Sequence, residues 1–195
     1  MIIWLNGAFG SGKTTTAFEL HYMLRDSFVY DPEKIGFFMV SNEPIEFRGD
    51  DFQDKPLWRK FNYEMIKNIA LNYTGTVIIP MTIINKEYYH EIISSLRNDG
   101  IRIDHYVLWA SEDTLIKRGR SRLCFKNSWS VRKIPYCLEA FKNPVFENQI
   151  NTDLLTTYEI IDIIAKKSNL DLLPNNKNKL QKWIRRKITQ IKHIR

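Results

Sequence analysis

The segment that most constrains the fold of this chain is a glycine-rich loop between a short apolar run and a helical pattern. Ile2–Asn6 supplies the apolar run, and Gly7-Ala8-Phe9-Gly10-Ser11-Gly12-Lys13-Thr14 follows it directly. This order fits G-x-x-x-x-G-K-[ST] in the strand–loop–helix setting that a phosphate-binding loop requires. Glycines let backbone N–H groups point inward, and the following helix presents the positive end of its dipole. The loop therefore predicts nucleotide binding after the first strand.

Each polar side chain of the loop has an expected role. Lys13 reaches the β and γ phosphates, and the Thr14 hydroxyl ligates magnesium, so ATP and Mg²⁺ are the expected cofactors. The expected nucleotide-binding residues are Gly7, Ala8, Phe9, Gly10, Ser11, Gly12, Lys13, Thr14 and Thr15. The alternative is a glycine-rich helix entry with a solvated lysine.

Beyond the loop, short apolar runs alternate with longer helical patterns. Strands are predicted over 2–6, 27–31, 76–84, 103–110 and, weakly, 145–151; helices are predicted over 13–25, 55–71, 86–98, from Glu112 onward, and over 156–167. Parallel strands need crossover helices, so this order predicts an α/β fold, a parallel sheet with helices on both faces as in P-loop NTPases and nucleoside kinases. With 195 residues, 44% of them hydrophobic, the chain can bury one substantial core.

Charge separates the chain into two predicted units, a kinase-like domain over 1–173 and a basic C-terminal helix over 174–195. The net charge is +7, but eight of the 29 basic residues lie in the last nineteen positions, which contain no acid. The basic character belongs to the tail, so net charge gives no reason to expect a nucleic-acid partner. In the tail, one helical face is apolar: Leu180, Trp183, Ile184, Ile188, Ile191 and Ile194. Such a helix either lies in an anionic membrane interface or docks on the core.

The cysteine spacing and the hydropathy of the chain indicate in which cellular compartment the protein acts. Cys124 and Cys137 match neither a metal knuckle nor a redox pair, and no apolar stretch approaches the ~18 residues of a membrane span. We therefore expect a cytoplasmic protein, with peripheral contact to the inner face of the membrane as a role for the tail.

The ends of the other strands narrow the class of P-loop protein. The third strand ends Ile78-Ile79-Pro80-Met81-Thr82 without an acid, and no guanine-reading N-K-x-D occurs. An acid instead follows the second strand, as Asp31. A carboxylate there can accept a proton from a substrate hydroxyl and help hold magnesium, as a small-molecule kinase requires. The alternative is a helix-capping Asp ahead of Pro32.

A basic cluster follows Glu112, at Lys117, Arg118, Arg120 and Arg122. Arg118 and Arg122 are four residues apart and share a helical face. Guanidinium groups there can stack on adenine and stabilise a transferring phosphoryl group, which makes these two arginines candidate catalytic residues with Lys13 and Asp31. A solvated basic helix face is the alternative.

The segment from Glu43 to Tyr63 is rich in aromatic and charged residues. In kinases of this architecture it closes over the acceptor, and its aromatic rings can stack on a uracil ring or cover a lipid chain. Phe52, Trp58 and Arg59 are the candidate substrate-binding residues, together with Asp31. Helix core positions with a surface arginine are an equally good interpretation.

The sequence resembles the tunicamycin resistance proteins nearly from end to end. The matching segments are Ile2 to Thr14, Val29 to Lys34, Asp51 to Gln53, Pro56 to Arg59, Pro80 to Ile83, Lys126 to Trp129, Asn151 to Asp153 and Lys192 to Arg195. The resemblance implies a P-loop kinase-like fold, ATP binding and protection of a bacterium against this nucleoside antibiotic. It leaves the mechanism open.

Three functions follow as hypotheses. The first is a Mg-ATP-dependent phosphotransferase that acts on tunicamycin or a related nucleoside-like hydroxyl compound. The second is an ATP-dependent protein that sequesters the antibiotic at the membrane face without modifying it. The third is a nucleotide kinase, which would turn over a nucleoside monophosphate.

Overall fold

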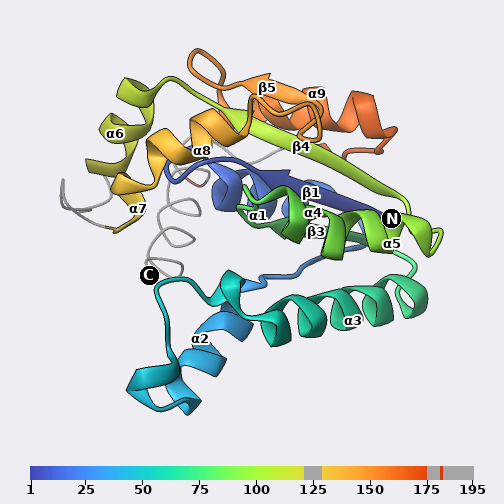
Figure 1. The fold of residues 1–195 in the computed structure, drawn as a ribbon. Helices are drawn as coiled ribbons and strands as arrows, with labels where there is room; N and C mark the ends of the chain where they lie inside the picture. The colour runs from blue at the N-terminus through green and yellow to red at the C-terminus, as the bar shows by residue number, and fades with distance from the viewer. Residues whose placement is uncertain (121–128, 175–180, 182–195) are drawn as a thin grey trace.

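A computed structural model of the protein describes residues 1–120, 129–174 and 181. In these residues five parallel strands form one sheet in the order β2-β3-β1-β4-β5 (Figure 1). The strands are β1 (Ile2–Asn6), β2 (Ser27–Val29), β3 (Thr76–Pro80), β4 (Ile103–Trp109) and β5 (Gln149–Asn151). After β1 the chain adds β2 and β3 on one side of this strand and then β4 and β5 on its other side, so the connections run in opposite directions from β1. Sheets of this kind bind ligands in the crevice beyond the carboxyl ends of such strands.

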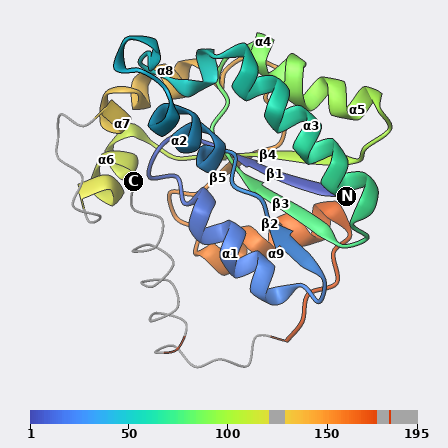
Figure 2. The same cartoon turned by 90° about the horizontal axis from the view of Figure 1, so that it is seen from below.

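Helices cover both faces of the sheet (Figure 2). One face packs against α1 (Lys13–Met23) and α9 (Thr157–Ser168) through side chains such as Ile3 and Leu5. The other face packs against α3 (Pro56–Asn72) and a continuous helix made of α4 (Lys86–Tyr89), the π-helical turn η3 (His90–Ser94) and α5 (Ser95–Asn98). Successive strand residues point to opposite faces, so β1 is apolar from Ile2 to Leu5 because both its faces are covered.

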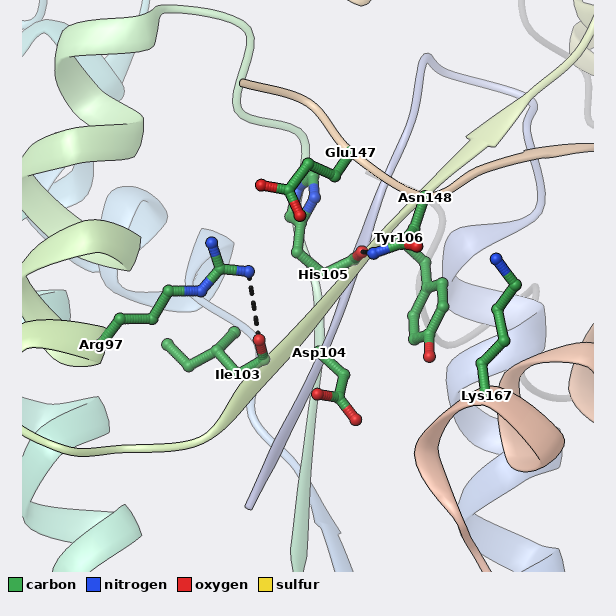
Figure 3. A pocket seen from close by; sticks show the side chains of 8 residues that line it. All are labelled: Arg97, Ile103, Asp104, His105, Tyr106, Glu147, Asn148 and Lys167. Atoms are coloured by element: carbon green, nitrogen blue, oxygen red, sulfur yellow. Dashed lines mark hydrogen bonds between the residues drawn. The ribbon is translucent and has the colours of Figure 1, made fainter. Parts of the chain in front are cut away.

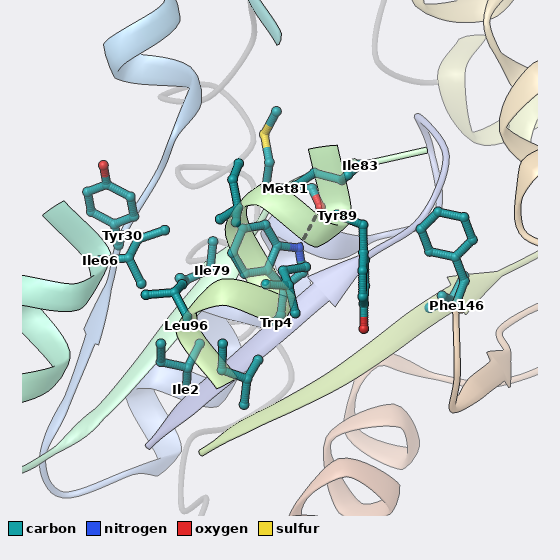
Figure 4. Close-up of a cluster of buried hydrophobic side chains, with 14 of the residues drawn as sticks. Ile2, Trp4, Tyr30, Ile66, Ile79, Met81, Ile83, Tyr89, Leu96 and Phe146 are labelled. Atoms are coloured by element: carbon teal, nitrogen blue, oxygen red, sulfur yellow. Dashed lines mark hydrogen bonds between the residues drawn. The ribbon is translucent and has the colours of Figure 1, made fainter. Parts of the chain in front are cut away.

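The larger core cluster surrounds Trp4 of β1 (Figure 4). Its indole Nε1 donates a hydrogen bond to the carbonyl of Met81 at 3.1 Å, which fixes the segment after β3 to β1. Nearby, the rings of Tyr89 and Phe146 meet edge to face with centroids 5.5 Å apart. Close packing of this kind holds the carboxyl ends of the central strands in a fixed arrangement.

The remaining elements gather near the carboxyl ends of the strands. An arm stands away from the sheet in Figure 1 and carries α2 (Glu33–Asn42), the 3₁₀ turn η1 (Ile45–Phe47) and the 3₁₀ turn η2 (Phe52–Asp54). On the other side lie α6 (Glu112–Arg120), α7 (Trp129–Arg132) and α8 (Ile134–Ala140).

The predicted fold class is confirmed, with the parallel sheet and helices on both faces. The predicted strands and long helices are present with shifted ends; β3, for example, stops at Pro80 instead of residue 84. The sequence analysis did not predict α2. Its run Ile35-Gly36-Phe37-Phe38-Met39-Val40 is apolar on all sides and shows no helical stripe, and Phe37 and Phe38 remain exposed.

The predicted C-terminal helix falls almost wholly outside the described residues, as does the segment 121–128. Among the helices of the described residues, none is long and apolar enough to cross a membrane.

Candidate active site

The phosphate loop joins β1 to α1 at the carboxyl edge of the sheet. Gly7, Gly10 and Gly12 have φ values of 142°, 83° and 99°. A Cβ on Gly7 would stand 2.5 Å from the carbonyl oxygen of Leu108, and a Cβ on Gly10 would stand 2.8 Å from that of Leu115. Side chains at these two positions would collide with the backbone of β4 and α6, which explains why glycine occupies them.

Asn6 anchors the loop at its start. This buried side chain accepts hydrogen bonds from the backbone N–H groups of Gly7 at 2.8 Å and Ile83 at 3.0 Å. Its amide nitrogen donates to the carbonyl of Ile83 at 2.8 Å and lies 3.2 Å from His105 Nε2. The hydroxyl of Thr82 donates to the carbonyl of Gly7 at 2.8 Å. The ends of β1 and β3 therefore hold the loop together.

Lys13 folds over the loop that it follows. Its Nζ donates to the carbonyl oxygens of Gly7 at 2.8 Å and Ala8 at 3.1 Å. The helix that Lys13 begins has Gly12 as its N-cap, with no side-chain hydrogen bond to its first amides. The Ser11 hydroxyl oxygen is buried and has no partner among the described residues. A buried orphan hydroxyl and uncapped amides beside an ammonium fit the phosphates of a nucleotide.

Thr14 and Asp31 are the residues that would hold magnesium. Thr14 lies in the first turn of α1, which follows β1, and Asp31 follows the edge strand β2, which β3 separates from β1. The described residues contain no group of three or more His, Cys, Asp or Glu side chains that could bind a metal. Magnesium at nucleotide sites uses one or two protein oxygens together with phosphates and water, so this donor set fits the ion.

The Asp31 carboxylate accepts a hydrogen bond from the backbone N–H of Glu33 at 3.1 Å. The carboxylate thereby satisfies one of the backbone N–H groups at the start of α2, where Pro32 is the N-cap. This contact is the one expected of the capping alternative, and it also holds the carboxylate at the carboxyl edge of the sheet.

Arg118 contacts the loop that follows β5. Its guanidinium donates to the Thr152 hydroxyl at 3.0 Å and to the Thr152 carbonyl at 2.6 Å. Because β4 separates β5 from β1, Thr152 lies about two strand spacings, roughly 10 Å, from the strand that leads into the phosphate loop. Asp31, at the end of β2, is separated from β1 by the same number of strands, and the catalytic role of Arg118 stays a prediction. Arg122 lies outside the described residues.

The three candidate substrate residues, Phe52 on the arm and Trp58 and Arg59 at the start of α3, have different environments. Phe52 is partly buried, with its ring centroid 5.9 Å from that of Phe37 and 5.4 Å from that of Trp58. Trp58 has no exposed surface, and its Nε1 donates to the carbonyl of Pro32 at 3.2 Å. A fully buried ring offers no face to a ligand, so Trp58 is a core residue beneath the site, as the alternative held.

Arg59 is not the surface arginine that this alternative assumed. It is only 8% exposed, and its guanidinium bonds to the Glu91 carboxylate at 2.6 Å and to the Gln53 carbonyl at 2.7 Å. The same group lies over the ring of Tyr88, 4.2 Å from its centroid. Arg59 thus fastens η2 to α3 and to the π-helical turn.

An ion pair that was not predicted from the sequence joins the arm to the start of α8. Asp51 precedes η2, and Lys133 precedes α8; Lys133 Nζ lies 4.0 Å from Asp51 Oδ2. Both influence the buried thiol of Cys137, whose pKa is raised by burial and lowered in part by Lys13 and Lys133. Local spacing gave no signal for this pair because the two residues lie on distant segments.

A separate cavity of about 310 Å³ lies at the other end of β4 (Figure 3). It is lined by Arg97, Ile103, Asp104, His105, Tyr106, Glu147, Asn148 and Lys167. Ile103 is the first residue of β4, so the cavity opens toward the amino ends of the strands. Ligands of such sheets bind at the carboxyl ends, and this cavity is not part of the candidate active site.

The fold and the loop define the class as a P-loop kinase-like α/β protein. A sugar kinase from Janibacter has a similar structure, with a TM-score of 0.61 and 18% identity over 87% of this chain and 94% of that one. A deoxyadenosine kinase from M. mycoides has a TM-score of 0.54 and 18% identity over 87% of this chain and 99% of that one. These likenesses concern the fold.

A likeness of higher identity points to a particular protein. The tunicamycin resistance protein of Deinococcus radiodurans has a TM-score of 0.75 and 27% identity, over 89% of this chain and 98% of that one. This similarity confirms the resemblance predicted from the sequence. No protein-family model and no curated protein matches the chain.

Proposed function

We propose that this protein is a Mg-ATP-dependent phosphotransferase that acts on tunicamycin or a related nucleoside-like hydroxyl compound. The observation that carries the proposal is the phosphate loop, in which Lys13 and the uncapped start of α1 lie at the carboxyl edge of the sheet, the edge at which Asp31 follows β2. The similarity to the tunicamycin resistance protein of D. radiodurans supports the choice of acceptor.

In the proposed reaction the acceptor hydroxyl oxygen attacks the γ phosphorus of ATP, the bond from that phosphorus to the bridging oxygen breaks, and ADP leaves. Asp31 takes the hydroxyl proton. Lys13 and the loop amides hold the β and γ phosphates, and these donors are fixed before reaction, which lowers the cost of stabilising charge in the transition state. Thr14 and Asp31 would hold magnesium, which would supply neutralisation of the phosphate charge. Arg118 and Arg122 stabilise the transferring group.

The arm supplies the acceptor side of the proposed site. Phe52 is the aromatic residue on the arm that is only partly buried and touches both α2 and the core. Arg59 acts through η2, whose carbonyl at Gln53 it binds. The basic segment 174–195 provides peripheral membrane contact. Deleting 176–195 should move the protein from liposome pellets to the supernatant while ATP binding persists; loss of folding would instead favour docking on the core.

One observation favours a second function, ATP-dependent sequestration without transfer. The Asp31 carboxylate already accepts the Glu33 amide, as a purely capping residue would. In that case Lys13 is still needed for ATP, but Asp31 has no proton to accept.

The test is ADP formation by the purified protein with magnesium, ATP and tunicamycin, measured in a coupled assay. We expect ADP production that depends on tunicamycin and is lost in Lys13→Ala. ATP-dependent retention of tunicamycin without ADP production would instead establish sequestration. Rapid ADP production with a nucleoside monophosphate in place of tunicamycin would establish the nucleotide kinase.

A further inference from the structure

The Asp51–Lys133 pair joins the arm to the start of α8. Asp51 lies on the arm, immediately before Phe52, and its side chain accepts the backbone N–H of Gln53 at 3.0 Å. Lys133 comes from the opposite side, at the start of α8. The carboxylate is the more buried partner, with its side chain 14% exposed, whereas that of Lys133 is 39% exposed.

The pair lies near the phosphate loop. Ile134 and Cys137 of α8 belong to the same core cluster as Ala8 of the loop. The pKa of the Cys137 thiol is raised by burial, lowered by Lys13 and Lys133, and raised by Asp51, so all three charged groups act electrostatically on one buried sulfur. Because the proposed acceptor must reach the phosphate end that Lys13 marks, the pair is a candidate contact for it.

The separation of the two charged groups admits a hydroxyl. Lys133 Nζ and Asp51 Oδ2 are 4.0 Å apart, which is too long for a direct hydrogen bond. A hydroxyl oxygen about 2.8 Å from each atom would accept from the ammonium and donate to the carboxylate at an angle of roughly 90°. A carboxylate or a phosphate dianion has no proton to donate, and the Asp51 carboxylate would repel it.

We propose that Asp51 and Lys133 bind a hydroxyl group of the acceptor between them and so select an uncharged, hydroxyl-bearing compound over an anionic one. The inference rests on the proposed function, because it assigns this pair to the acceptor of that reaction. It adds a recognition element from α8 to the residues of the arm, and it argues against a nucleoside monophosphate as acceptor.

The charges that face the pair are consistent with this selection. The pKa of Asp51 is raised by burial, lowered by the Gln53 amide and by Lys133, and raised by Asp54. Asp54 itself accepts a hydrogen bond from the hydroxyl of Tyr88 at 2.8 Å. The pair therefore has a second carboxylate beside it on the arm, and this makes an anionic acceptor less favourable still.

The experiment measures binding without transfer, by calorimetry with tunicamycin in the presence of magnesium and a non-hydrolysable ATP analogue. Lys133→Gln should weaken tunicamycin binding about tenfold or more, as expected for losing a charge-assisted hydrogen bond, and leave affinity for the analogue within about twofold. Lys142→Gln is the matched control, since Lys142 follows the same helix and pairs with Glu139 on the exposed surface. This control should bind both ligands as the wild type does.

A second set of measurements distinguishes ligand recognition by the pair from a purely structural ion pair. Wild-type protein should bind uridine more tightly than uridine monophosphate, and Asp51→Asn should weaken uridine binding while strengthening uridine monophosphate binding about fivefold or more. Asparagine keeps the acceptor for the Gln53 amide, so η2 retains its start. If the ion pair were purely structural, Asp51→Asn would change the affinities for uridine and for uridine monophosphate in the same direction.

Three results would overturn the inference: unchanged tunicamycin affinity in Lys133→Gln, a wild-type preference for uridine monophosphate, or no binding of either tunicamycin or uridine. If the binding pattern is as expected but wild-type protein forms no ADP with tunicamycin, phosphoryl transfer is refuted and the recognition pair stands.

Discussion

Replacing Asn6 with alanine should destabilise the protein severely, although this residue is not expected to touch substrate. Its side chain serves four buried groups: the N–H of Gly7, both backbone groups of Ile83, and Nε2 of His105. A typical hydrogen bond contributes about 1 kcal/mol net, and a buried group left without a partner costs about 1–3 kcal/mol. Some of these groups will find water, so the expected loss is about 3–5 kcal/mol, in the range reserved for broken buried networks.

The assay is urea unfolding at pH 7.5, with the free energy of unfolding taken from the midpoint and slope. Asn72→Ala is the matched control because this amide donates to Asn68 at the exposed end of α3, and it should cost less than about 1 kcal/mol. A loss below 1 kcal/mol in Asn6→Ala would refute the reasoning. Asn6→Asp adds a second readout: a carboxylate opposite Nε2 should raise the pKa of His105 from about 3, visible in NMR titration.

Three further predictions concern the loop, acid stability and catalysis. Gly10→Ala should weaken ATP binding at least tenfold because its Cβ would stand 2.8 Å from the Leu115 carbonyl oxygen. The control is Gly49→Ala, which has a φ of 64° and no atom within 4 Å of the added Cβ, and it should leave ATP affinity unchanged. Equal ATP affinity in both variants would contradict this packing argument. Burial lowers the pKa of His105 to about 3, so between pH 6.5 and pH 3 the unfolded chain binds a proton that the folded protein does not. The free energy of unfolding should therefore fall as the pH falls from 6.5 toward 3, by up to about 1.4 kcal/mol per pH unit. His105→Gln should flatten this part of the stability curve measured in urea, and an unchanged slope would show that His105 is not its source. Asp31→Asn should abolish phosphoryl transfer and keep ATP affinity within about twofold, since asparagine still accepts the Glu33 amide; undiminished turnover would remove Asp31 from the role of base.

The phosphate loop could be predicted from the sequence because its requirements are local. The glycines, Lys13 and the preceding apolar run are contiguous, and the backbone geometry follows from residue type. The alternation of strands and helices was likewise readable, since periodicity reports which faces are covered. The arm was not, because α2 is apolar on all sides and its Phe38 stays 66% exposed.

The acceptor side depends on tertiary packing, which spacing does not encode. Trp58 and Arg59 are adjacent in sequence and both buried, but one fills the core and the other ties η2 to Glu91. Arg118 shows the same limit: a helical face predicted its direction, whereas its contact with Thr152 depends on where β5 lies. The pairing of Asp51 with Lys133 required the three-dimensional fold.

The central claim is that the phosphate loop delivers the γ-phosphoryl group of ATP to a hydroxyl of tunicamycin. Mass spectrometry of the antibiotic after incubation with the purified protein, magnesium and ATP tests it most directly, with Lys13→Ala as the blank. We expect a mass gain of one phosphoryl group that is absent from the blank. Recovery of unmodified tunicamycin from wild-type protein that retains it only when ATP is present would contradict phosphoryl transfer.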